Sequence, residues 1–154
     1  MKLSKRWSEK FKTKYTFFNI VYNMDVIRGL QGKGIVHADI HVLDLSYKIN
    51  QDHNVRMELQ HLGTKDHKGD WATGLIEYTI APHWSISLMD QYNYGNEDPD
   101  KRLHYLLGKL GYVQGGTRVS VGYGRQRAGI YCVGGVCRTV PASNGFKVSL
   151  KTNF

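Results

Sequence analysis

The sequence has almost no helical periodicity and no long apolar run. None of its 154 residues belongs to a stretch of 18 consecutive apolar residues, which excludes a transmembrane helix. The opening segment MKLSKRWSEKFKTKYTFF lacks an apolar core after its charged start, which excludes a secretory signal peptide there. Nucleophile-elbow, phosphate-loop and zinc motifs are also absent, so we expect neither an enzyme nor a protein with a cofactor.

What the sequence does have is alternation of apolar and polar residues, which is the signature of β-strands. The gaps between the alternating segments are short and long in turn: QDH, APH and GG are short, and the others are longer and polar or glycine-rich. This alternation is typical of an up-and-down barrel in a bacterial outer membrane, with short periplasmic turns and long outer loops. We therefore predict an all-β, antiparallel transmembrane barrel whose eight strands lie near 14–27, 34–49, 54–63, 71–80, 84–94, 102–114, 117–131 and 144–154.

The short turns also predict a strand register. Each hairpin must place its apolar residues on one face, and a slip of one residue would reverse the faces. The glycines of the GG turn suit a tight two-residue hairpin, because glycine tolerates positive φ. The predicted partners are Ile49 with Val55 and Tyr47 with Met57, Ile80 with Trp84 and Tyr78 with Ile86, and Tyr112 with Val119 and Leu110 with Val121. Adjacent apolar residues at 17–18 and 42–43 break the alternation and suggest bulges or strands that extend beyond the lipid.

The two predicted faces differ in chemistry. One is apolar and carries aromatic residues near the strand ends, as in the interfacial girdles of membrane barrels: Tyr47, Trp71, Tyr78, Trp84, Tyr92, Tyr94 and Tyr112. The other bears charges expected to line the lumen: Asp44, Lys48, Arg56, Glu58, Glu77, Lys109, Lys147 and Lys151. A soluble lipocalin-like barrel would instead turn the apolar face inward around a small apolar ligand, and this alternative stays open.

The net charge of +8 is concentrated near the N-terminus. Residues 1–14 contain six lysines and arginines against Glu9. We predict a basic N-terminal periplasmic segment at 1–13 and a barrel domain at 14–154. No nucleic-acid-binding motif accompanies this charge, so we expect no nucleic-acid partner.

Three motifs could carry chemistry. Cys132 and Cys137 in CVGGVC are the only cysteines, and we expect them to form a disulfide at a hairpin tip, with free thiols as the alternative. In HADIH, His37, Asp39 and His41 share one strand face, where they could ligate a metal or serve as polar lumen or rim residues. The GNEDPDK segment lacks the spacing of a calcium loop, so we predict a solvated loop without a metal.

The last residues, FKVSLKTNF, resemble the C-terminal recognition signal of outer-membrane barrels. That signal has a final aromatic residue and apolar residues at alternate positions upstream, here Phe154, Leu150, Val148 and Phe146, whereas Thr152 departs from the pattern. The resemblance implies that the barrel assembly machinery recognises this strand.

A longer resemblance covers roughly residues 34–154. HVLDLSYKIN, RMELQHLGTKDHKGDWATGLIEYTIAPHWSISLMDQYNYGN and GYGRQRAGIYCVGGVCRTVPASNGF are similar to the C-terminal part of an uncharacterised outer-membrane barrel family from Bacteroidota, whose members are several times longer. The resemblance implies an integral outer-membrane protein with both termini in the periplasm. It also implies either eight strands that close alone or the last eight strands of a larger, porin-like barrel. The expected partners are membrane lipid, the assembly machinery and a protein bound through the outer loops.

Overall fold

Most of the chain forms β-strands. The computed structural model describes residues 1–154 apart from 24, 27–31, 33, 65–68, 134–135 and 154, and the side chains of 22 and 129–139 also lie outside the described part. Within the described residues, no helix has the length and hydropathy needed to cross a membrane. The strands are β1 (Lys2–Arg6), β2 (Phe11–Asn23), β3 (Ile35–Lys48), β4 (His53–Gly63), β5 (Trp71–Ile80), β6 (Trp84–Tyr92), β7 (His104–Gln114), β8 (Thr117–Gln126), β9 (Gly129–Val133), β10 (Val136–Val140) and β11 (Ser143–Thr152), with a short 3₁₀ helix η1 (Pro99–Lys101) before β7.

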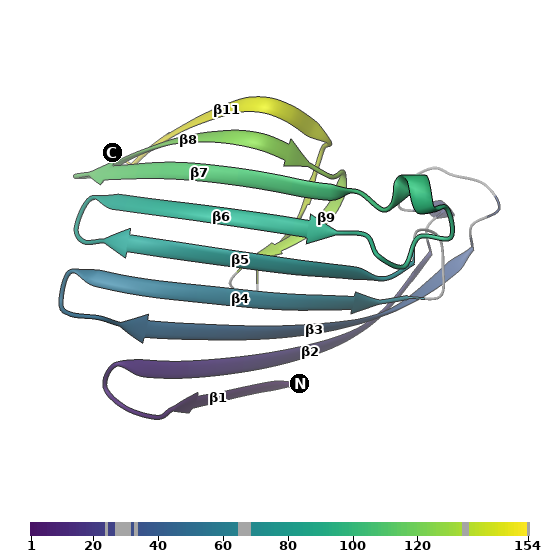
Figure 1. Ribbon diagram of the computed structural model, residues 1–154, viewed down its shortest axis with the longest axis horizontal. Coiled ribbons are helices and arrows are strands. Elements are labelled where there is room, and N and C mark those ends of the chain that lie inside the picture. Colours follow the sequence, from purple (N-terminus) through teal and green to yellow (C-terminus); the bar gives the residue numbers. More distant parts are fainter. Residues whose placement is uncertain (24, 27–31, 33, 65–68, 134–135, 154) are drawn as a thin grey trace.

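Nine of these strands form one antiparallel sheet in the order β1-β2-β3-β4-β5-β6-β7-β8-β11. The short turns lie at one end of the curved sheet and the long connections at the other (Figure 1). The eight predicted strands are all present, but the predicted number is wrong because β1 adds a ninth. The KLSKR segment has no clear apolar alternation. It becomes a strand by pairing with the β2 residues Lys12–Thr16. Trp7, in the turn between the two strands, donates from Nε1 to Thr13 Oγ1 of β2 at 2.9 Å.

The register of two predicted hairpins is confirmed. Ile80 opposes Trp84 across the APH turn, and Tyr112 opposes Val119 across the GG turn, where Gly115 adopts a φ of +56°. The prediction for the QDH hairpin is wrong by two residues, because Val55 opposes Tyr47.

The shifted turn at this hairpin is explained by Asn50. Its side-chain oxygen accepts hydrogen bonds from the backbone N–H groups of Asp52 and His53, at 3.0 and 2.8 Å. This turn closes at Ile49 and His53, because the Ile49 N–H donates to the His53 carbonyl at 3.0 Å. Because the shift is an even number of residues, every side chain stays on its predicted face.

The strands β2 and β3 contain no bulge, contrary to one interpretation of their broken alternation. Their pairing runs without interruption from Phe11 opposite Tyr47 to Asn23 opposite Ile35. The two strands therefore continue in regular geometry toward the long-loop end, while their polarity reverses. There, Val36, Ala38, Ile40 and Val42 are buried on the concave side, and polar residues occupy the convex side.

The connection between β8 and β11 folds back as the β9–β10 hairpin instead of projecting away from the sheet. This hairpin is a separate two-stranded sheet that lies behind the main sheet in Figure 1. Just before it, the Arg127 guanidinium lies over the ring of Trp71, 4.1 Å from the ring centroid. The hairpin thus lies on the concave side of the main sheet.

The sheet is open, with β1 and β11 at its two edges. Neighbouring strands alternate in direction, so the first and ninth strands of the sheet run the same way. Bacterial single-chain outer-membrane barrels close with antiparallel partners and have an even number of strands. The β1 and β11 edges cannot meet each other in that geometry.

Candidate functional site

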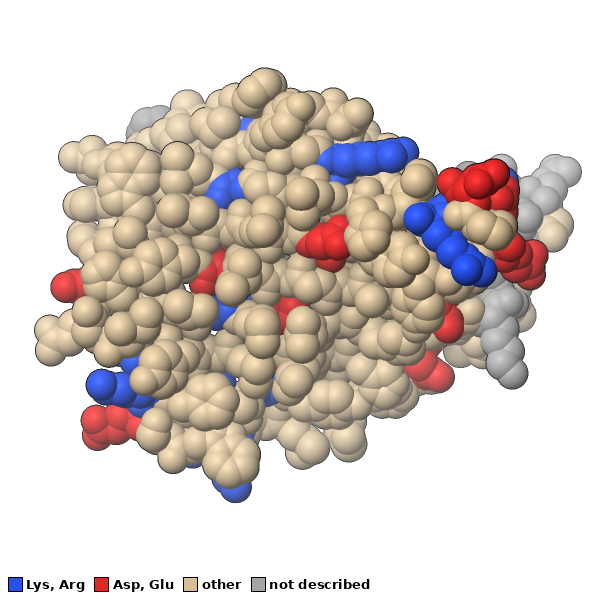
Figure 2. Space-filling view, in the orientation of Figure 1, with Lys and Arg blue, Asp and Glu red and all other residues tan. Residues whose placement is uncertain are grey.

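The convex face of the sheet is apolar and exposed. Ile86 is 50% exposed in the middle of β6, and the apolar residues at the corresponding positions of the neighbouring strands are similarly accessible. Figure 2 views this face and shows mainly uncharged side chains over the strands, with charged side chains at both the long-loop and the short-turn ends. The exposed large apolar residues on this face include Leu43, Tyr47, Met57, Leu59, Ile76, Trp84, Ile86, Leu88, Leu106, Leu110, Val119, Val121, Tyr123, Phe146, Val148 and Leu150. A continuous apolar surface of this kind marks a region that contacts lipid or another protein.

Aromatic residues lie at both ends of this convex face. Toward the short turns, Trp84 packs on Tyr112 with ring centroids 4.6 Å apart, and Tyr78 bonds His53 through its hydroxyl at 2.6 Å. Toward the long loops, Tyr92 stacks on His104 at 4.2 Å. Most of the predicted girdle therefore lies on one face. Tyr94 lies just beyond β6, and its hydroxyl bonds the Nε2 atom of His61.

Trp71 departs from the predicted girdle, because it lies on the opposite face. It is only 5% exposed and packs beside Tyr105, with ring centroids 5.8 Å apart. Its register position opposite Leu62 gives it the same parity as the buried Leu75, so it belongs to the concave side. Position near a strand end suggested a girdle residue, but strand parity decides the face.

The sequence interpretation missed that histidines pair with aromatic residues on the convex face. His41 bonds the Tyr15 hydroxyl through Nδ1 at 2.6 Å, and the ring of His83 packs beside Tyr112. Together with the contacts above, an aromatic neighbour accompanies five histidines: His41, His53, His61, His83 and His104. The sequence signal that could have revealed them is that these histidines lie near strand ends and alternate in step with the apolar residues.

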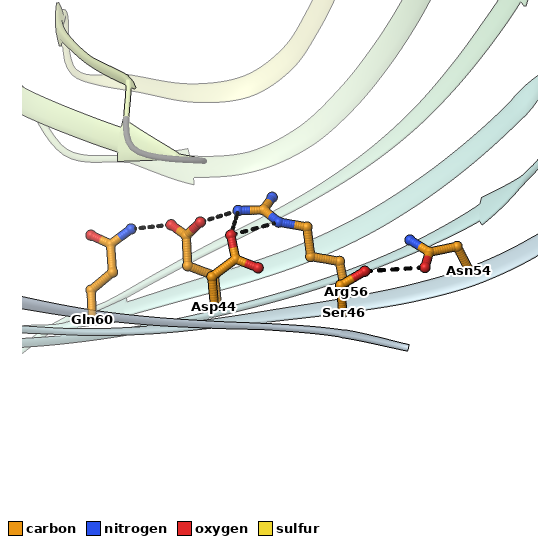
Figure 3. Close-up of polar contacts among 6 residues, drawn as sticks. Asp44, Ser46, Asn54, Arg56 and Gln60 are labelled. Carbon is orange, nitrogen blue, oxygen red and sulfur yellow. Dashed lines mark hydrogen bonds and ion pairs between the residues drawn. The ribbon is translucent and has the colours of Figure 1, made fainter. Parts of the chain in front are cut away.

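The concave face centres on a buried ion-pair network (Figure 3). Asp44 and Glu58 are direct cross-strand partners, so their negative charges would repel without a cation between them. Arg56 supplies that cation: its Nη2 lies 2.8 Å from Asp44 Oδ2 and also bonds Glu58. Gln60 donates to the other oxygen of Glu58, whose side chain is only 1% exposed. In this arrangement both carboxylates are bound by Arg56, and it places no nucleophile beside a base.

The other predicted lumen residues share the concave face. Glu77 opposes Arg56 across β4 and β5, and Lys147 donates to Gln126 Oε1 at 3.0 Å. Lys48, Lys109 and Lys151 have the same strand parity, opposite Asn54, Gly122 and Arg118 respectively. All eight predicted lumen residues thus lie on the side away from the exposed apolar surface.

The HADIH residues lie on the convex side, near the long-loop rim. Asp39 Oδ1 accepts a hydrogen bond from Asn19 Nδ2 at 2.7 Å, and His41 is bound to Tyr15 as described above. His37 belongs to the same parity, opposite Val21. In the part of the chain that the structure describes, no group of three potential metal ligands converges.

The GNEDPDK loop is organised by its own side chains. Asp98 caps the 3₁₀ helix η1 by accepting from the Asp100 N–H, and its Oδ2 lies 2.7 Å from Lys101 Nζ. The hydrogen bond from Lys101 lowers the pKa of the Asp98 carboxyl, and the Asp100 N–H contributes in the same direction. The loop is thus held by local contacts.

The terminal strand presents its signal residues outward. Phe146, Val148 and Leu150 lie on the convex face at 82%, 71% and 70% exposure, because β11 is an edge strand. Phe154 lies outside the described residues. Cys132 and Cys137 are direct backbone partners in the β9–β10 hairpin, and their side chains lie outside the described part.

Comparison with known proteins places this geometry in a family. No curated protein and no solved structure matches the chain. The whole chain, residues 1–154, matches the Family of unknown function (DUF6029). The chain, an all-β protein whose main sheet has one apolar and one charged face, belongs to this DUF6029 family.

Proposed function

We propose that the chain is an integral outer-membrane β-barrel protein, or part of one, whose convex face contacts lipid and whose concave face lines the lumen. The observation that carries this proposal is that the sheet exposes its apolar residues on the convex face and buries charged residues on the concave face. Ile86 and Leu88 are about half exposed on the convex side, whereas Glu58 is 1% exposed on the concave side. A soluble barrel buries its apolar face, while an outer-membrane barrel turns that face to lipid.

Strand length and aromatic placement support the same proposal. A membrane strand needs about 9–11 residues to cross the hydrocarbon core. The strands β4 to β8 and β11 have between 9 and 11 residues, and β2 and β3 have 13 and 14. Aromatic residues at both ends of the convex face match the interfacial girdles of membrane barrels.

The proposed setting is the outer membrane of Bacteroidota, with both termini and the short turns in the periplasm. The partners would be membrane lipid, the assembly machinery acting on β11, and a protein bound by the outer loops. We propose a non-catalytic role without a cofactor. Eight strands leave an interior that side chains fill, whereas a wider barrel leaves a channel, so the role would be structural or porin-like according to how the sheet is completed.

A soluble lipocalin-like carrier is the second candidate. The observation that favours it is a small apolar cluster on the concave side, formed by the buried residues Leu75, Met89 and Leu107. A carrier would bind an apolar ligand against this cluster. Its exposed convex surface would then need another cover, which is why the membrane proposal is preferred.

The first test is heat modifiability after refolding in detergent micelles. Boiled and unboiled samples are compared on a gel, and circular dichroism measures β-content. A membrane barrel gives β-rich spectra and a faster unboiled band. Aggregation without detergent and no band shift would indicate a sheet that needs further strands. A soluble, cooperatively folded monomer without detergent would overturn the membrane proposal and favour the carrier.

A further inference from the structure

The concave face is strongly basic once β1 is included in the sheet. Strand parity places on this face ten cations, Lys2, Arg6, Lys12, Lys14, Lys48, Arg56, Lys109, Arg118, Lys147 and Lys151, against three carboxylates, Asp44, Glu58 and Glu77. The resulting excess of seven positive charges is nearly the whole net charge of +8. Four of the six N-terminal cations, Lys2, Arg6, Lys12 and Lys14, therefore belong to the same surface as the predicted lumen residues.

These charges are segregated along the sheet. All three carboxylates lie on the central strands β3, β4 and β5, where Arg56 bridges Asp44 and Glu58. The cations on β1, β2, β8 and β11 flank this centre on both sides. Lys14 illustrates the separation: it opposes Asp44 across β2 and β3, but the Asp44 carboxylate is bound by Arg56.

Two pairs of cations are direct cross-strand neighbours. Arg6 opposes Lys12 in the β1–β2 hairpin, and Arg118 opposes Lys151 between β8 and β11. All four side chains are exposed, and none forms an ion pair with a described carboxylate. Directly opposed like charges destabilise a sheet unless an anion lies between them. Both pairs lie at the short-turn end of the sheet, one near each edge.

We propose that these two basic pairs are binding sites for a soluble multivalent oxyanion of the phosphate type. Two cations a few ångströms apart on one face can contact two oxygens of the same anion, as charge-assisted hydrogen bonds require. The sites face the concave side, away from the apolar surface, so the ligand comes from water and not from a lipid headgroup. This inference rests on the sheet geometry and not on the membrane proposal, so either can fail without the other.

The test is calorimetric titration of inorganic pyrophosphate into the full chain, refolded in an uncharged detergent at low ionic strength. We expect Arg6→Gln/Lys12→Gln and Arg118→Gln/Lys151→Gln each to weaken binding at its own site about tenfold. The matched control is Lys5→Gln/Lys10→Gln, which removes two charges from the same N-terminal region but not from an opposed pair. This control should bind like the parent chain.

Thermal melting checks the folding of each variant. Without pyrophosphate, relief of like-charge repulsion should leave the melting temperature of the paired variants unchanged or raise it. Pyrophosphate should raise the melting temperature of the parent chain more than that of the paired variants. The proposal is overturned if the parent chain binds no pyrophosphate. It is equally overturned if the control weakens binding as much as the paired variants, since binding would then follow net charge alone.

Discussion

At the scale of single residues, Arg56 has the largest predicted effect on stability. It is the cation between Asp44 and Glu58, and Glu58 is 1% exposed. Replacing one partner of a buried ion pair leaves an uncompensated charge, which costs about 3–5 kcal/mol. We expect Arg56→Met to lower the free energy of unfolding by this amount in urea titrations of the refolded chain. Lys48→Met, at an exposed position of the same face, should change it by under about 0.5 kcal/mol. Equal effects of both variants would contradict the network's role.

The second residue-scale prediction concerns Cys132 and Cys137. Directly opposed residues of an antiparallel pair have Cα atoms about 4.5–5.5 Å apart, within the range that a disulfide spans. We expect the oxidised chain to resist thiol alkylation and to weigh two hydrogens less by mass spectrometry than the reduced chain. Reduction should cost about 2 kcal/mol, because the closed loop is short. Alkylation of both cysteines without reductant would show free thiols instead.

The alternation of the sequence predicted which face carries the concave charges, but it did not predict the face of every aromatic residue. The alternation around Arg56 and Glu77 fixes their common face, and the register keeps it. Trp71 was assigned from its position near a strand end, whereas its pairing opposite Leu62 turns it to the concave side. The contact between His41 and Tyr15 joins residues 26 positions apart, so no local pattern could reveal it.

At the scale of single elements, alternation predicted all eight of the longer strands of the main sheet, but local turn chemistry decided their register. The Asn50 side chain shifts one turn and moves Tyr47 from Met57 to Val55. The strand β1 escaped prediction because its alternation is weak and its stability comes from pairing with β2. The β9–β10 hairpin was expected as an outer loop, and its place on the concave side depends on tertiary contacts such as Arg127 over Trp71.

The strand β6 offers a matched test of which face meets lipid. Ile86 lies on the convex face at 50% exposure, and the next residue, Ser87, lies on the concave face opposite Lys109. An arginine facing the middle of a bilayer costs about 2–4 kcal/mol. We expect Ile86→Arg to lose this much stability in vesicles, measured by urea unfolding. Ser87→Arg serves as the adjacent control on the polar face and should lose less. Equal losses, or no loss for Ile86→Arg, would argue against lipid on the convex side.

At the scale of the whole molecule, forming a barrel requires that the two edges of the sheet be covered. An open sheet edge in contact with lipid leaves backbone groups without hydrogen-bond partners, so a membrane sheet must close. The edges β1 and β11 run in the same direction, and both carry basic residues on the concave side. Direct pairing of these edges is disfavoured by direction and by charge. Without β1, the strand β2 would instead present an edge antiparallel to β11.

Deletion of residues 1–8 tests this closure. We expect the shortened chain to pair β2 with β11, which gives eight antiparallel strands. The unboiled sample should then run as a faster gel band, and the β11 amides that point away from β8 should exchange hydrogen slowly. Salt should assist, because it screens Lys14 from the lysines of β11. Leu3→Pro, which disrupts β1 pairing while keeping the N-terminal lysines, should produce the same change more weakly. Slow exchange at these amides in the full chain would mean that β11 is already covered, and β1 would then not be what prevents closure.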